Sequence, residues 1–164
     1  MTEHLEALVA ALRGELTQYG ELLALLDQQQ EQVMAREAEE TLRLAAAINQ
    51  QSGLVREARE RREQCVRELA RATGAGGDAT LTELLPRLPE EYQLLIQALL
   101  DENNRLLVRV QQRARQNHLL LARTVELMRK FIESLLPAGG TSVYDQSGRV
   151  GTGLPGTSLY QAVG

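Results

Sequence analysis

Residues 89–136 read PEEYQLLIQALLDENNRLLVRVQQRARQNHLLLARTVELMRKFIESLL and form one uninterrupted helical pattern. Counting every seventh residue gives the row Ile96, Asn103, Val110, Asn117, Thr124 and Phe131. A second row with the same seven-residue repeat begins three residues after Ile96 and contains Leu99, Leu106, Arg113, Leu120, Leu127 and Ser134. A mostly apolar seam at this spacing is typical of a coiled-coil helix. At about 1.5 Å per residue the sequence predicts a rod about 70 Å long, which needs other helices or another protein to cover its stripe.

Composition places the chain among proteins built from long helices. Ala, Glu, Lys, Leu and Arg make up about half of the residues, and there are four Tyr, one Phe and no Trp. Such a shortage of aromatic bulk favours thin helix-on-helix packing. The net charge of −4 argues against a nucleic-acid or anionic-membrane partner. We therefore expect an elongated antiparallel helical bundle of the all-α class.

Two further long helices are expected before residue 74. The first, over about residues 3–34, has Thr2 as its N-cap and an apolar stripe that includes Leu5, Leu8, Leu12, Tyr19, Leu22 and Leu26. The second, over about residues 38–73, has a weaker stripe formed by Leu42, Ala45, Ile48, Ser52, Val55, Val66 and Leu69. No Gly or Pro marks the turn between them, so we place the reversal near residues 34–38, and one continuous helix is the alternative.

A short fourth helix is expected over residues 80–87. Gly74 suits the position after the end of the second long helix, and Thr80 and Glu83 have the spacing of a capping box. Pro86 and Pro89 then reverse the chain into the rod of residues 89–136. The predicted helical domain is therefore 1–136, and residues 137–164 form a Gly-rich, irregular tail.

No residue pattern indicates a catalytic, metal or cofactor site. Residues 151–156 match G-x-G-x-x-G, but Pro155 lies inside the motif and no strand–helix pair surrounds it, so a phosphate site is rejected. His4 and His118 lack a second ligand at helical spacing, and Cys65 has no nearby His. One cysteine excludes an internal disulfide and suits a reducing compartment. No apolar run approaches the roughly 20 residues of a membrane span, so we expect a cytoplasmic protein that is not an enzyme and has no membrane insertion.

The end of the rod carries more apolar side chains than one neighbouring helix covers, and Met and Phe are adaptable contact residues. The excess favours recognition of an amphipathic partner helix. Burial by the other helices or by a second copy of the chain, as a homodimer, is the alternative. Asn103 and Asn117 lie two heptads apart in the seam and are expected to set its register, unless Asn117 faces a partner's backbone.

The rod and tail together resemble the FlgN family of flagellar export chaperones. The resemblance rests on an asparagine followed by leucines on a long helix and on a short tail with a Tyr-Asp-x-x-Gly pattern. The matching segments are RQNHLLL at 115–121, VEL at 125–127, FIESL at 131–135 and VYDQSG at 143–148. The acidic, Leu-rich first helix and the charged second helix fit the same family.

The resemblance implies a function and a site. Members are small, acidic, cytoplasmic helical chaperones. They bind the C-terminal helices of hook-associated (hook–filament junction) proteins, prevent premature association, and deliver these clients to the flagellar export apparatus. The end of the long helix and the tail hold the client in the family. Here that implies a client-binding set of Asn117, Leu120, Leu121, Thr124, Leu127, Met128, Phe131, Ile132, Leu135 and Tyr144. A self-associating coiled-coil scaffold or regulatory adaptor without a secreted client is the alternative function.

Overall fold

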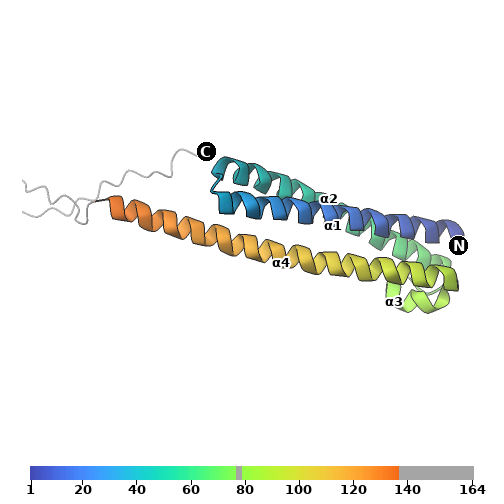
Figure 1. The fold of residues 1–164 in the computed structure, drawn as a ribbon. Helices are drawn as coiled ribbons and strands as arrows, with labels where there is room; N and C mark the ends of the chain where they lie inside the picture. Colours follow the sequence, from blue (N-terminus) through green and yellow to red (C-terminus); the bar gives the residue numbers. More distant parts are fainter. Residues whose placement is uncertain (77–78, 137–164) are drawn as a thin grey trace, which may run out of the picture. The chain divides into compact units, whose positions relative to one another are not determined.

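The computed structural model describes residues 1–76 and 79–136, and within these residues it contains helices and no strand. The helices are α1 (Thr2–Ala35), α2 (Ala38–Ala72), the single turn α3 (Leu81–Leu84), the 3₁₀ turn η1 (Leu85–Arg87) and α4 (Glu90–Leu135) (Figure 1). The all-α class is confirmed for this part of the chain. The tail expected at 137–164 lies outside the described residues, and the domain boundary at residue 136 stays a prediction.

The chain divides into two compact units, Met1–Ala122 and Arg123–Gly164. The first contains α1, α2, α3, η1 and most of α4. In the second, the described residues are the remainder of α4 and Leu136. Each unit is described below by itself.

α1 and α2 form an antiparallel hairpin whose turn lies at Arg36 and Glu37. The backbone of Arg36 is left-handed, with φ of 62°. Its N–H donates to Val33 O at 3.2 Å, and the N–H of Glu37 donates to Gln32 O at 3.0 Å, so the last carbonyls of α1 are satisfied without a glycine. This settles the choice between a turn and a continuous helix in favour of the turn.

The start of α1 differs by one residue from the prediction. Thr2 is already helical, and Met1 occupies the N-cap position, with no side-chain cap. The prediction of a Thr2 cap is wrong because the backbone of Met1 supplies the first helical carbonyl, which accepts from the N–H of Leu5 at 3.2 Å.

The connection from α2 to α4 follows the local signals in the sequence. Gly74 has φ of 69°, and the N–H of Ala75 returns to Ala70 O at 2.9 Å, which closes α2. The capping box at α3 is present: the N–H of Thr80 donates to the Glu83 carboxylate at 2.8 Å, and the N–H of Glu83 donates to the Thr80 hydroxyl at 3.4 Å. Together with η1, this turn brings the chain back so that α4 begins beside the N-terminal end of α1.

Within Met1–Ala122, α4 runs parallel to α1 in constant register. The Asn103 side-chain amide donates to Leu12 O at 3.1 Å, and that of Asn117 donates to Leu26 O at 2.7 Å, both across a sequence offset of 91. The buried residues of α4 recur every seven positions: Ile96, Asn103, Val110 and Asn117. At the same offset they face Leu5, Leu12, Tyr19 and Leu26, all of which are buried. A constant offset over whole heptads is what coiled-coil pairing requires.

Two apolar clusters with buried polar residues between them form the core of this unit. One gathers residues at the start of α1, the end of α2, α3 and the start of α4, and the other joins Tyr19, Leu22, Leu23 and Leu26 to Val55 and Val110. Between them, buried Glu15 pairs with Arg62 of α2 at 3.2 Å. The α2 stripe was only partly predicted: Leu42 is exposed, whereas Leu44, Gln51 and Ala70 are buried.

No helix in the described part of the chain is long and apolar enough to cross a membrane.

Candidate partner-binding surface

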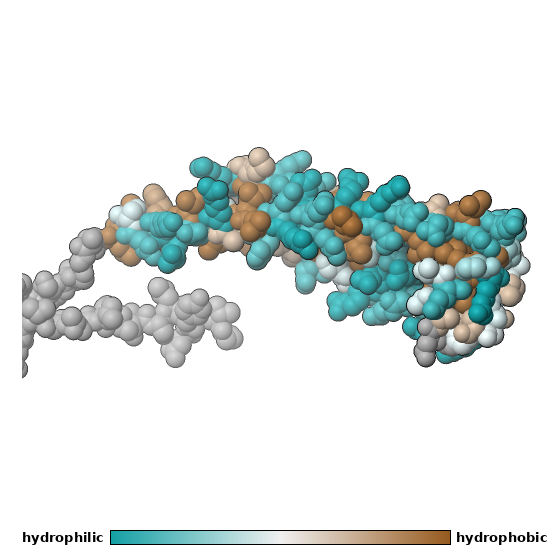
Figure 2. Space-filling view, turned by 90° about the horizontal axis from the view of Figure 1, so that it is seen from below, coloured by the Kyte–Doolittle hydropathy of each residue, from teal (hydrophilic) through white to brown (hydrophobic). Residues whose placement is uncertain are grey.

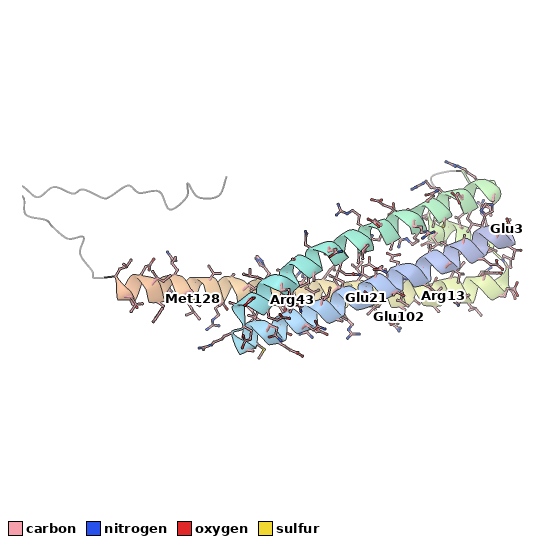
Figure 3. The ribbon with its side chains drawn as sticks, turned by 90° about the horizontal axis from the view of Figure 1, so that it is seen from above. Glu3, Arg13, Glu21, Arg43, Glu102 and Met128 are labelled. Atoms are coloured by element: carbon pink, nitrogen blue, oxygen red, sulfur yellow. The ribbon has the colours of Figure 1, made fainter. Side chains whose placement is uncertain are left out.

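The last turns of α4, in the second unit, expose large apolar side chains. Val125, Leu127, Met128, Phe131, Ile132 and Leu135 each keep 56–68% of their area accessible. We call this set the terminal apolar face. Brown, hydrophobic residues are visible at this end of α4 in Figure 2, and Met128 is labelled there in Figure 3. Single exposed apolar residues are ordinary, but a contiguous group on one helix marks a contact surface.

The terminal apolar face continues the heptad frame of the buried part of α4. If Ile96, Asn103, Val110 and Asn117 occupy position a, then Phe131 is also at a and Leu127 is at d. Met128 and Leu135 follow at e, and Val125 and Ile132 at b. At about 100° per residue, Leu127 and Val125 lie about 160° apart around the helix. The apolar surface therefore covers nearly half of the helix circumference, which is wider than an a/d seam.

Two ion pairs lie on the other side of this helical segment. Lys130 pairs with Glu126 at 2.9 Å, and Arg129 pairs with Glu133 at 3.3 Å, each one turn apart. Exposed pairs of this kind contribute about 0–1 kcal/mol. The segment is therefore amphipathic, and its apolar side bears no charged residue.

The structure separates Asn117 from the other residues of the predicted client-binding set. Its side chain is 2% exposed, and its amide nitrogen donates to Leu26 O and to Gln29 Oε1 at 3.1 Å. Asn117 thus lies between α1 and α4, in the register role expected for it, rather than on an open surface. Its place in client binding stays a prediction.

The remaining residues of the predicted set lie in different environments. Leu120 and Leu121 are half-buried and belong to the first unit, and Thr124 is exposed. Leu120 and Thr124 each have an interaction within the protein. Leu127, Met128, Phe131, Ile132 and Leu135 are exposed together. Tyr144 lies outside the described residues. Val125 is 68% exposed and completes the surface. It was not in the predicted client-binding set, and the signal for it in the sequence is its apolar side chain at helical spacing.

A polar cluster joins α1 to α4 just before the terminal segment. The guanidinium of Arg113 contacts Asp27 at 2.6 Å, and it also bonds the side chain of Gln30. The sequence did not predict the contact between Arg113 and Asp27, because the two residues lie far apart in the chain. The signal in the sequence was the placement of charged Arg113 in the mostly apolar d row.

The groove between α1 and α2 was considered as a second candidate site. It measures about 740 Å³ and is floored by small residues such as Ala7, Ala10, Gly14 and Ala58, with Cys65 at one side. Burial, assisted by the negative charge of Glu68, raises the pKa of the Cys65 thiol. The thiol is therefore protonated and unreactive near neutral pH. Among the described residues, no group of His, Cys, Asp and Glu has the arrangement of a metal site.

Burial likewise raises the pKa of the Tyr19 hydroxyl, and the neighbouring Glu15 carboxylate adds to the shift. Tyr19 therefore stays neutral at physiological pH and acts as a core residue. The candidate surface in the described part of the chain is therefore the terminal apolar face.

Comparison with known proteins gives one match. The model of a family described as "FlgN protein" matches residues 1–152, which include every described residue. Neither the curated proteins nor the solved structures contain a match to this chain.

Proposed function

Since this chain belongs to the FlgN family, and that membership supports a role as a flagellar export chaperone, we propose that it binds the C-terminal helices of hook-associated proteins through the terminal apolar face. Binding takes place in the cytoplasm, before the client reaches the flagellar export apparatus. The chaperone performs no chemistry. It shields an aggregation-prone segment until export.

The observation that supports this proposal is the exposure of the terminal apolar face. Fully burying one large aliphatic or aromatic side chain stabilises a complex by about 1.5–3 kcal/mol. More than half of each side chain in this set is still accessible. Covering them together offsets the cost of association, which is about 4–15 kcal/mol. A partner helix with an apolar side supplies the complementary surface.

The same burial explains how a chaperone of this kind delays assembly. A hook-associated protein that self-assembles through its terminal helices must expose their apolar sides beforehand. While those sides lie on α4 they are unavailable to other copies of the client. Release requires only that the export apparatus compete for the client or for the chaperone.

Binding to C-terminal fragments of hook-associated proteins tests the proposal. We expect a stable complex at micromolar concentration in isothermal titration calorimetry. Phe131→Asp places a charge in the middle of the apolar surface and should abolish the complex. Glu133→Gln, on the charged side of the same helix, is the matched control and should leave the affinity unchanged. Tyr144→Ala tests the expected contribution of the tail.

Failure of every fragment to bind would contradict the proposal, and full binding by Phe131→Asp would move the site elsewhere. The second candidate, a self-associating scaffold, is favoured by the same exposed face because a second copy of the chain could cover it. A solution mass measurement separates the two. A tight dimer that buries Phe131 and ignores flagellar clients would support the scaffold.

A further inference from the structure

The width of the terminal apolar face indicates how many helices cover it. Within the first unit, the same heptad positions of α4 are covered from two sides. On the d side, Arg113 contacts Asp27 of α1. On the e side, Leu100 lines a groove together with Arg62 and Val66 of α2. The buried a row lies between these two neighbours, and Asn103 and Asn117 bond α1 from it.

Two antiparallel helices, α1 and α2, are therefore what the a, d and e rows of α4 accept inside this chain. The flanking side chains Leu106 and Leu107, at d and e, pack against one cluster built from both α1 and α2. The d and e side chains point about 100° apart around the helix, and the cluster against which they pack has members from both α1 and α2.

The terminal apolar face repeats this pattern and extends it. Positions a, d and e are apolar at Phe131, Leu127 and Met128. Position b, which is polar and exposed upstream at Gln97, Asn104, Gln111 and His118, becomes apolar at Val125 and Ile132. The face is thus at least as wide as the one that α1 and α2 cover together. A single partner helix leaves one of its margins in water.

We propose that the partner covers the terminal apolar face with two antiparallel amphipathic helices, one seated along the a/d margin at Leu127 and the other along the e/b margin at Val125. The partner helices take the role for this segment that α1 and α2 take for the rest of α4. Their contact sides are aliphatic, because the side chains of the terminal apolar face are uncharged and two ion pairs of the segment lie on its other side. This inference rests on the proposed function, since it describes how the client of that site is held.

Substitutions at the two margins test the inference in the full-length chain. Leu127→Asp and Val125→Asp lie about 160° apart, and both residues are exposed, so neither change should disturb the helix. Ala122→Asp adds the same side chain at position f, outside the apolar rows, and is the matched control. The probe is a client C-terminal fragment long enough to contain two helical segments, and circular dichroism verifies that each variant is folded.

We expect each margin variant to weaken client binding at least tenfold and the control to stay within twofold. Loss of binding at one margin only would overturn the inference, because a single helix then covers that side. If Met128→Asp, at the centre of the face, abolished client binding while both margin variants bound normally, the inference would be overturned in favour of one central helix. Failure of the unmodified chain to bind any client would instead defeat the proposed function, so the two failures are distinguishable.

Discussion

Replacing Asn103 by Asp tests whether its amide lies buried between α1 and α4. Asn103 is 3% exposed, and its amide nitrogen donates to Leu12 O at 3.1 Å and to Leu99 O at 3.0 Å. Its Oδ1 has no partner among the described residues. An aspartate of the same shape loses both donated bonds and points a second acceptor at two carbonyl oxygens.

The magnitude follows from these contacts. Each lost bond costs about 1 kcal/mol, and a buried carboxylate without a partner brings the total to about 3–5 kcal/mol. Burial raises the pKa of the introduced carboxyl above its unfolded value, so the native state binds the proton more tightly than the unfolded state. The destabilisation must therefore be smallest at acid pH, below about pH 4, and grow as pH rises through the raised pKa.

Urea unfolding followed by circular dichroism at several pH values measures this effect. Asn103→Leu is the matched control. It removes the same two bonds but also the unpaired oxygen, and it adds apolar burial, so its unfolding free energy should stay within about 1 kcal/mol of the parent. Equal stability of the Asp and Leu variants at neutral pH would refute the placement of Asn103 against α1.

Three further predictions use other contacts. Arg36→Gly should raise the unfolding free energy by about 1 kcal/mol, because Arg36 has φ of 62° and Gly has no steric penalty there. Gly74 has φ of 69°, so Gly74→Ala should lower the unfolding free energy by a similar amount. Urea unfolding measures both changes. Arg62→Met leaves the buried Glu15 carboxylate without its ion-pair partner and should lower the unfolding free energy by about 3 kcal/mol, measured as a lower thermal midpoint. Adding Glu15→Gln to the same chain should restore most of this stability, and no rescue would contradict a direct pair. Alkylation of Cys65 by iodoacetamide at pH 8 should be slower than that of an unfolded control, because burial raises its pKa, and an equal rate would contradict its burial.

Much of the local structure could be predicted because its causes are local. The αL position of Gly74 and the reciprocal bonds of Thr80 and Glu83 depend on residues within one or two turns. The turn at Arg36 was located only as a region, since it uses a left-handed arginine where the sequence has no glycine signal. The buried face of α2 was harder to predict from the sequence. Leu42 and Leu44 are both apolar, and only the packing of α2 in the folded chain decides that Leu44 is the buried one.

The candidate site shows the same division. Spacing predicted an apolar excess at the end of α4, and the family resemblance assigned Leu127, Met128, Phe131, Ile132 and Leu135 to client binding. Spacing could not say that Asn117 is withdrawn from that surface by its bond to Leu26, because the partner lies far away in the chain.

The sequence by itself determined how many long helices there are and roughly where they lie, the heptad frame of α4, and the amphipathic character of its last turns, because periodicity and capping act within a few residues. The tertiary structure alone decided that the a row of α4 runs parallel to α1 at an offset of 91, and that Glu15 is buried against Arg62. A helix's periodicity fixes which side is apolar, but which neighbour covers that side depends on contacts between segments that only the folded chain brings together.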